Sequence, residues 1–236
     1  MIAEPNAKIF LAEKRLKLEN PFNQNFTTYL PEQIDLSRKT VVGVSSSLSD
    51  DILKGGISLL VEVKADSWVV FVPYIGDLIL RFGQEYQLLL AEGEVMVKTF
   101  KKGELYEIRN PSPDDHINFF QLRFFSEFSH KYEVSDIQMA AYPNAVRSIV
   151  TSGSTSISIG LYEDRKKGVY TLRSSQNGLF VYVIEGVFEC KDHLVQKRDG
   201  LALRNVETVE FEALSQGAVL LLVEFETPNV VFVSNG

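Results

Sequence analysis

The chain has 236 residues, of which 45% are hydrophobic and 23% are charged, and its formal net charge is −7. This is the composition of a globular protein, and its acidic balance disfavours direct binding to nucleic acid, whose phosphates attract surplus lysine and arginine. No apolar run approaches the roughly 20 residues that cross a bilayer, and residues 1–20 lack the continuous apolar region of a signal peptide. We therefore expect a cytoplasmic protein with no membrane partner.

Short runs of β-branched and aromatic residues, bounded by glycine, asparagine or charged residues, predict strands along the whole chain. In chain order they are residues 41–44, 57–63, 68–72, 78–82, 87–90, 94–100, 117–125, 156–161, 168–172, 179–184, 206–211 and 218–225. Helix is expected only in 13–18 and 136–141. Basic clusters at 14–17, 101–102 and 165–167 are expected to be solvated turns or strand ends. So many short strands predict an all-β sandwich or barrel.

Residues 126–154 are more polar and less periodic, and they contain turn signals such as Tyr142-Pro143-Asn144. We therefore expect an N-terminal barrel with a leading segment in 1–130, a linker in 131–154 and a C-terminal barrel in 155–236. Each half has a strand that closes on glycine, Gly76 in the first and Gly186 in the second. This weak internal repeat is typical of a duplicated barrel.

The segment Asn110-Pro111-Ser112 is followed by acidic residues and an aromatic-rich strand at 117–125. This pattern resembles the end of the N-terminal barrel in the pirin and quercetin 2,3-dioxygenase-like bicupin family. Asp50-Asp51 with Gly56 resembles its lead into the metal-binding strand. The strand that closes on Gly186, the Asp199-Gly200 turn and the terminal strand 218–225 resemble its C-terminal cupin. The resemblance implies an all-β bicupin, with two antiparallel cupin barrels of the jelly-roll type in one chain.

The resemblance also implies a metal site in the N-terminal barrel, held by a His-x-His pair and a His-x-Glu pair. An ungapped match places these four positions on Glu62, Lys64, Tyr106 and Ile108. The ammonium group of Lys64 has no lone pair to give and Ile108 has no donor atom, so neither can coordinate a metal. If Glu62 and Tyr106 still coordinated, two oxygen donors without histidine would make a weak site for such metals. We therefore expect no cofactor, although the family implies iron or another divalent metal. We expect the four residues to line the N-terminal cavity, with Glu62, Lys64 and Tyr106 in a neutralising hydrogen-bonded cluster.

The other candidate metal-binding or reactive residues are the three histidines and the single cysteine. His116 follows an acidic turn and His130 lies near the predicted linker, so both are expected to be solvated. His193 lies near Cys190, Asp192 and Glu189, a grouping that would suit a small metal site, but no motif supplies further ligands. Cys190 is expected to be a buried thiol. The chain has no nucleophile elbow, phosphate loop or dinucleotide fingerprint, so no catalytic residue is predicted.

Two function classes remain open. The first is a pirin-like bicupin without metal ligands, which acts as a non-catalytic small-molecule-binding, regulatory or scaffold protein. The second is a quercetinase-like dioxygenase with a metal site rebuilt from other residues. In the aromatic strand, Phe119, Phe120, Phe124 and Phe125 must divide between two faces, because side chains alternate. One pair is expected inside the barrel, and the other against the second domain or a partner.

Overall fold

The computed structural model describes residues 7–30, 34–35, 40–41, 46–83, 86–125, 132–137 and 139–226. Regular structure in these ranges is almost entirely strand, and the strand pairs are antiparallel. The 3-10 helices within the described ranges are η1 (Ala12–Lys14) and η3 (Met139–Ala141). None of the described helices is long and apolar enough to cross a membrane. The all-β prediction is confirmed.

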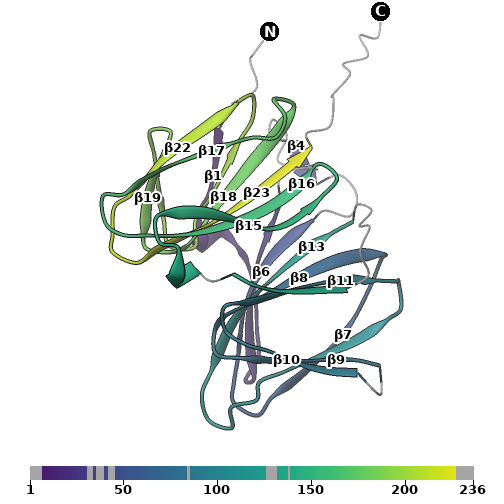
Figure 1. Cartoon of the computed structure of the whole chain (residues 1–236). Coiled ribbons are helices and arrows are strands. Elements are labelled where there is room, and N and C mark those ends of the chain that lie inside the picture. The colour runs from purple at the N-terminus through teal and green to yellow at the C-terminus, as the bar shows by residue number, and fades with distance from the viewer. Residues whose placement is uncertain are drawn as a thin grey trace, which may run out of the picture.

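The N-terminal lobe contains a seven-stranded and a four-stranded sheet that enclose one apolar core (Figure 1). In order across the first sheet, the strands are β14 (Tyr132–Asp136), β11 (Glu94–Phe100), β8 (Ser67–Ile75), β13 (Ile117–Phe124), β6 (Ser47–Leu53), β3 (Asn23–Tyr29) and β2 (Leu16–Glu19). Across the second they are β10 (Tyr86–Leu90), β9 (Leu78–Phe82), β12 (Leu105–Arg109) and β7 (Ser58–Glu62).

The C-terminal lobe repeats this arrangement with a six-stranded and a four-stranded sheet around a second core. The larger sheet runs β1 (Ala7–Phe10), β21 (Gly200–Leu203), β18 (Asn177–Glu185), β23 (Ala218–Glu226), β16 (Thr155–Tyr162) and β15 (Ala145–Ser152). The smaller runs β17 (Lys167–Thr171), β22 (Thr208–Ala213), β19 (Val187–Cys190) and β20 (His193–Gln196). A separate hairpin consists of β4 (Ile34–Asp35) and β5 (Thr40–Val41).

A third core lies between the two large sheets and draws residues from both lobes. The aromatic strand β13 divides its side chains as alternation requires. Phe119 packs inside the N-terminal barrel, whereas Phe120 and Phe124 face the third core. The Phe120 ring lies 6.1 Å from the ring of Tyr182 in the other lobe, centroid to centroid. The lobes are therefore joined through buried apolar surface.

Chain connections differ from the predicted linear division. Strand β1, in the leading segment, pairs with β21 of the C-terminal sheet. The segment 131–154, predicted as the linker, contains β14, which pairs with β11, and β15, which pairs with β16. These strands carry few consecutive apolar residues, so their sequence resembles that of a loop. The expected helix at 13–18 is wrong, since β2 begins at Leu16 and alternates apolar and charged residues.

The two glycines that the sequence matched between the halves have the same backbone conformation. Gly76 has a φ of 76° and Gly186 a φ of 78°, in the left-handed region that strongly favours glycine. A Cβ at Gly76 would lie 2.7 Å from Ile117 Cγ2, and one at Gly186 would lie 2.3 Å from Ser215 Oγ. Both positions therefore exclude a side chain for two reasons, as expected for equivalent turns in two related barrels.

Candidate functional site

Apolar side chains line the interior of the N-terminal barrel where the resemblance places a metal. In the β7–β12 pair, Val61 lies opposite Tyr106 and Leu59 lies opposite Ile108. Tyr106 and Ile108 are buried, and all four residues belong to or pack against the barrel core. Since opposite residues share a face, these four side chains point into the barrel together. The only polar atom that they bring there is the Tyr106 hydroxyl.

Glu62 and Lys64 lie outside the barrel, which corrects the expectation that they line its cavity. Their side chains are 53% and 78% exposed and form an ion pair with each other. Val63 between them is 1% exposed and belongs to the barrel core. The reason is strand alternation: positions 59, 61 and 63 face inward, so the ungapped match was out of phase with the pleat by one residue. The predicted cluster of Glu62, Lys64 and Tyr106 does not form.

Tyr106 instead takes part in hydrogen bonds with strand β13. Its hydroxyl donates to Gln121 Oε1 at 2.9 Å and accepts from Arg123 Nη2 at 2.7 Å. Arg123 Nη1 also donates to Ser67 Oγ at 3.0 Å. Burial raises the pKa of Tyr106 to about 12, so the phenol is neutral at physiological pH. The ring packs edge-on against Phe71, with 5.5 Å between centroids.

The same network continues to a buried carboxylate on β6. Gln121 Nε2 donates to Asp51 Oδ2 at 2.9 Å, and Asn25 Nδ2 donates to Asp51 Oδ1 at 2.7 Å. Asp51 is 4% exposed, and burial raises its pKa to about 6. We call Asn25, Asp51, Gln121, Tyr106, Arg123 and Ser67 the interior polar chain. Sequence reasoning missed the part that β13 plays in it, although the polar residues Gln121 and Arg123 alternate there with apolar ones.

The interior polar chain does not fit an iron, nickel, manganese or copper ion. A mononuclear site of that kind needs several imidazole or carboxylate lone pairs that converge on one point. The chain offers one carboxylate, whose oxygens already accept from Asn25 and Gln121, and the cationic Arg123 is bonded to the phenol. Across the described ranges, no group of three or more His, Cys, Asp and Glu side chains has the arrangement of a metal site.

A second polar cluster joins the two lobes, and we call it the interlobe ionic cluster. Arg15 Nη1 lies 2.8 Å from Asp50 Oδ2, and Arg198 Nε lies 3.4 Å from the same oxygen. Asn118 Nδ2 donates to Asp50 Oδ1 at 2.8 Å, and Arg15 Nη1 donates to the Tyr182 hydroxyl at 3.1 Å. The Asp50, Arg15 and Arg198 side chains are 5%, 10% and 13% exposed. One carboxylate thus faces two guanidinium groups, and Arg198 Nη1 is buried without a hydrogen-bond partner. The cluster links residues of both lobes away from solvent.

The C-terminal barrel holds a buried carboxylate of its own, that of Glu224. It accepts from Tyr170 Oη at 2.9 Å, Asn177 Nδ2 at 2.6 Å and the backbone N–H of Arg173 at 2.8 Å. Burial and the neighbouring Glu224 carboxylate raise the pKa of Tyr170 to about 12. With three donors directed at it, this carboxylate has its hydrogen-bonding needs met by the protein.

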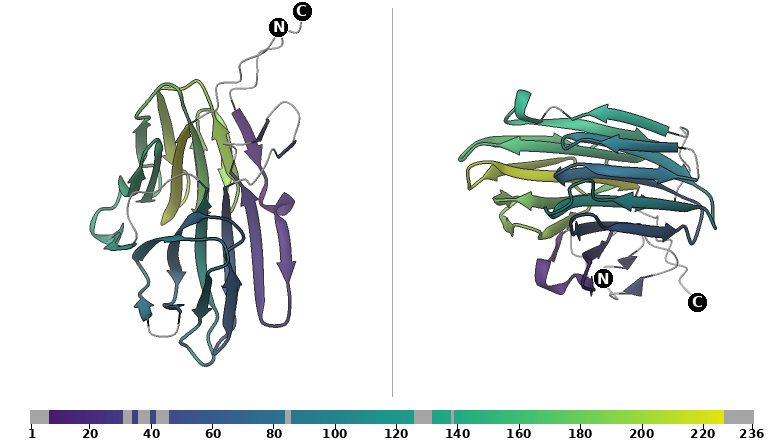
Figure 2. Two further views of the ribbon diagram at one scale, coloured as in Figure 1. Left: turned by 90° about the vertical axis from the view of Figure 1, so that its right-hand side faces the viewer. Right: turned by 90° about the horizontal axis from the view of Figure 1, so that it is seen from below.

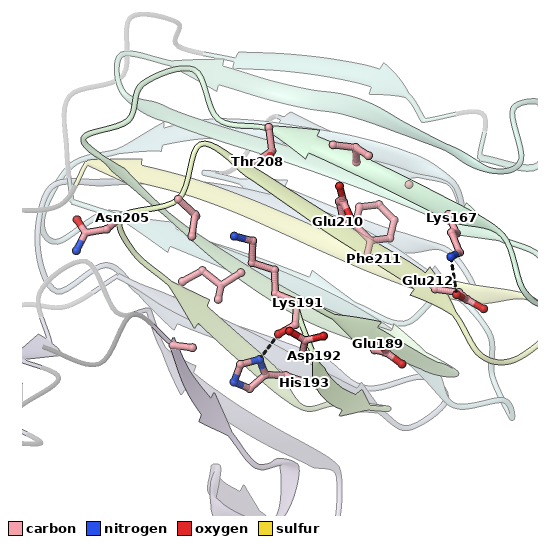
Figure 3. A pocket seen from close by; sticks show the side chains of 15 residues that line it. Lys167, Glu189, Lys191, Asp192, His193, Asn205, Thr208, Glu210, Phe211 and Glu212 are labelled. Carbon is pink, nitrogen blue, oxygen red and sulfur yellow. Dashed lines mark hydrogen bonds and ion pairs between the residues drawn. The ribbon is translucent and has the colours of Figure 1, made fainter. Parts of the chain in front are cut away.

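An open pocket of about 880 Å³ lies on the smaller sheet of the C-terminal lobe (Figure 3). Charged side chains from β17, β19 and β22 line it, among them Lys167, Glu189, Glu210 and Glu212. Lys167 Nζ lies 3.4 Å from Glu212 Oε2, while Glu189 sits directly across the strand pair from Glu212. The pocket therefore presents charges of both signs beside apolar side chains such as Leu203, Val206 and Phe211.

The remaining sequence candidates are not brought together into a site. Cys190 is fully buried, and burial raises the pKa of its thiol to about 12, whereas His193 lines the open pocket. The His193 ring nitrogen Nδ1 lies 2.6 Å from the Lys191 carbonyl, which is consistent with Nδ1–H donating to it. His116 is exposed, and His130 lies outside the described residues.

Comparison with known proteins gives one sequence match and many structural ones. Residues 144–224 match the model of the quercetinase C-terminal cupin domain. No curated protein matches the chain in sequence. The structure of YhhW from Escherichia coli superposes with a TM-score of 0.75 at 13% identity, over 94% of this chain and 97% of that one. Another YhhW structure, at 13% identity and a TM-score of 0.72, is described as a bacterial pirin in complex with nickel(II) and is covered in full by 94% of this chain.

The quercetin 2,3-dioxygenase of Acinetobacter baumannii is similar over 94% of this chain and 86% of its own, with a TM-score of 0.67 at 15% identity. At these identities the likeness establishes the fold, and the domain match adds the type of the second barrel. The predicted bicupin architecture and the resemblance are confirmed. This chain therefore has the bicupin fold of these structures, and its residues 144–224 match the quercetinase C-terminal cupin domain.

Proposed function

We propose that this bicupin is a metal-independent protein that acts by binding, in a regulatory or scaffold role, and not by catalysis. The observation that carries the proposal is the inward-facing set of Leu59, Val61, Tyr106 and Ile108 in the N-terminal barrel. Three of these side chains have no donor atom, and the fourth uses its hydroxyl to bond Gln121 and Arg123. A metal-dependent oxygenase requires the opposite chemistry at this place.

The nature of the binding follows from where open space and charge lie. The N-terminal barrel holds an apolar core and the interior polar chain, whose groups already bond one another, so we infer that a small polar ligand binds elsewhere. The pocket of about 880 Å³ on the C-terminal lobe is large enough and polar enough for such a ligand. The net charge of −7 argues against nucleic acid as the direct partner. We place the protein in the cytoplasm, where its lone cysteine would stay reduced.

The alternative is a quercetinase-like dioxygenase with a metal site built from other residues. The domain match over 144–224 and the likeness to the Acinetobacter enzyme favour that alternative. However, the domain match covers the second barrel, whereas the resemblance places the metal ligands in the first. The two proposals differ in one measurable property, which is the affinity of the folded protein for divalent metals.

Metal content and thermal stability test the proposal together. Untagged protein is purified without chelator, its metals are measured by plasma mass spectrometry, and unfolding is followed with added Fe(II), Ni(II) or Mn(II). We expect less than about 0.1 equivalent of any transition metal, because no preformed set of ligands holds one. A metal that bound the folded state at 100 times its Kd would stabilise it by about 2.7 kcal/mol. We expect no such stabilisation.

Two variants make the result specific. Tyr106→Phe removes the one oxygen that the inward-facing set presents, and Glu62→Gln changes only the surface ion pair. Near-stoichiometric metal in the wild-type protein that is lost in Tyr106→Phe and kept in Glu62→Gln would overturn the proposal. Quercetin consumption, measured by loss of its absorbance, would then be present in the wild-type protein and Glu62→Gln and absent in Tyr106→Phe.

A further inference from the structure

Strand β2 forms an exposed edge of the seven-stranded sheet (Figure 2, left). Among the described residues it pairs only with β3, and its four residues Leu16–Glu19 are all exposed. The surrounding stretch is unusually apolar for a surface. Six large hydrophobic side chains between positions 9 and 29 are at least 40% exposed: Ile9, Leu11, Leu16, Leu18, Phe22 and Tyr29. An open edge with exposed apolar residues is a template for pairing with another strand.

The hairpin that joins β2 to β3 determines which backbone groups face the open edge. The Asn20 N–H donates to the Asn23 carbonyl at 3.0 Å. In an antiparallel pair, residues that bond the partner alternate with residues whose N–H and C=O point away. Leu18 therefore also bonds β3, whereas Lys17 and Glu19 direct their backbone groups outward. The edge thus offers two residues, spaced two apart, for pairing with a new strand.

The side chains of these two residues carry opposite charges, which matters for pairing with an identical strand. If a second β2 lies antiparallel with Leu18 on the twofold axis, Lys17 of each copy faces Glu19 of the other. Opposite charges directly across an antiparallel pair are favourable, and like charges are unfavourable. A twofold axis at Lys17 would place Lys17 against its own equivalent, and one at Glu19 would place Glu19 against its own equivalent. An axis at Leu16 would place Lys17 opposite residue 15, whose side chain is already bound to Asp50. Only the register centred on Leu18 is complementary.

We propose that β2 is a self-association edge through which two copies of this chain pair antiparallel, with Leu18 on the twofold axis. The same surface patch serves both copies, as a twofold interface requires. In this register Lys17 and Glu19 exchange backbone hydrogen bonds, and Leu18 meets its own equivalent as a non-hydrogen-bonded pair. The two seven-stranded sheets then become one continuous sheet. Lys17, from the basic cluster at 14–17, supplies the positive charge of each pair, whereas Arg15 of that cluster is buried against Asp50 and is not solvated as expected.

Cysteine cross-linking tests the register. Non-hydrogen-bonded residues across an antiparallel pair have Cα atoms about 4.5 Å apart, within the disulfide range of about 4.4–6.8 Å. Leu18→Cys should therefore form a covalent dimer under mild oxidation. Leu16→Cys is the matched control, since the two copies of that residue would lie about 13 Å apart along the strands. We expect at least about tenfold more covalent dimer from Leu18→Cys than from Leu16→Cys. The native Cys190 is 0% exposed and does not compete.

Charge reversal tests the pairing without cysteine. Lys17→Glu and Glu19→Lys each place like charges across both pairs and should weaken dimerisation by about tenfold or more. The double variant restores opposite charges and should recover the dimer, and an equimolar mixture of the two single variants should form heterodimers. Lys102→Glu and Glu207→Lys, at exposed positions far along the chain from β2, are controls with the same charge changes. Sedimentation velocity at several hundred micromolar protein and low salt measures each case.

The substituted side chains are exposed. Lys17 Nζ also lies 2.6 Å from Glu19 Oε2 within the same strand, and the double variant keeps this ion pair, so recovery in the double variant is read together with thermal unfolding of all three variants. Cross-linking at position 18 but not 16, with dimer loss in both single charge variants and recovery in the double variant, would establish the proposal. A wild-type protein that stays monomeric at the highest concentration would overturn it. Equal cross-linking at both positions, or a dimer indifferent to the charges at 17 and 19, would also overturn it by showing a different contact.

Discussion

The hydroxyl of Tyr106, on β12, bonds two side chains of β13. It both donates to Gln121 and accepts from Arg123, so its removal leaves two buried polar groups short of a partner. An unsatisfied buried group costs about 1–3 kcal/mol. We expect Tyr106→Phe to lower the free energy of unfolding by about 2 kcal/mol in urea titrations. Glu62→Gln, on the outer face, should leave it nearly unchanged, and equal losses in both variants would contradict the inward placement of Tyr106.

Asp51 makes stability depend on pH in the direction opposite to a surface carboxylate. Burial raises its pKa in the folded state to about 6, from an ordinary value of 3.8. The folded protein therefore binds a proton more readily than the unfolded chain, and Asp51's contribution to stability is lost as pH rises from about 4 to about 6. At about 1.4 kcal/mol for each pH unit of difference, the loss approaches 3 kcal/mol.

The test is the difference in unfolding free energy between Asp51→Asn and the wild-type protein. The variant should become more stable relative to the wild-type protein between pH 4 and pH 7, because asparagine does not titrate and Asp51 does. Urea titrations at closely spaced pH values measure this difference, with the exposed Asp114→Asn as control. A difference that is flat with pH, or that moves in favour of the wild-type protein, would show that Asp51 is not buried as an acid.

For single residues, the sequence showed which residue types occupy the candidate positions. It did not show which face of the strand each side chain occupies. The four candidate ligand positions lack histidine whatever their orientation, and among the four inward-facing side chains of β7 and β12 only Tyr106 carries a polar atom. The orientation of Glu62 and Lys64 was wrong because a shift of one residue moves a side chain to the other face of a strand. A motif match cannot fix that phase, whereas the burial of Val63 does.

Elements from both lobes meet at the interlobe ionic cluster, which brings together β6, β13 and the turns before β2 and β21. Asp50 is the anion that faces both Arg15 and Arg198. Removal of one partner from a buried ion pair costs about 3–5 kcal/mol because the remaining charge is left uncompensated. We expect Asp50→Asn to lower the free energy of unfolding by about 3 kcal/mol in urea titrations. Asp66→Asn, which breaks an exposed pair with Lys101, should have a far smaller effect. Equal effects would contradict the burial of the cluster.

Elements rich in apolar residues were predictable, and polar edge elements were not. Strands β8, β18 and β23 are buried along nearly their whole length and appear in the sequence as continuous apolar runs. Strands β2 and β15 are partly or fully exposed and carry charged or hydroxyl side chains, so their composition does not distinguish them from loops. They form strands because they pair with a neighbouring strand, and which strand that is depends on the tertiary structure.

The whole molecule is held together by a core that belongs to neither lobe alone. Val70 and Phe124 from the first lobe pack in the same cluster as Ile159 and Val223 from the second. We therefore expect calorimetry to show one unfolding transition, with equal calorimetric and van't Hoff enthalpies. Trp68→Ala, at the shared core, should lower the temperature of the whole transition. Two separate transitions, only one of which moves in Trp68→Ala, would contradict this coupling.

The bicupin architecture itself was predictable, because strand density and the matched glycines are properties of local sequence. The pairing of β1 with the C-terminal lobe was not predictable, because the sequence of a four-residue strand does not indicate which strand it will pair with. Long-range pairing of this kind depends on which edge remains free once the other strands have paired.

The pairing of β1 with the C-terminal lobe has a consequence for synthesis on the ribosome. The Ala12 N–H donates to the Asp199 carboxylate across 187 positions of sequence, and β1 pairs with β21 just beside it. Strand β1 therefore emerges long before its partner exists, while β2 to β14 can already assemble the first lobe behind it. Closure of so distant a contact is slow compared with local pairing. Strand β1 is therefore synthesised early but pairs late. During synthesis it stays unpaired with β21 until the second lobe has been made.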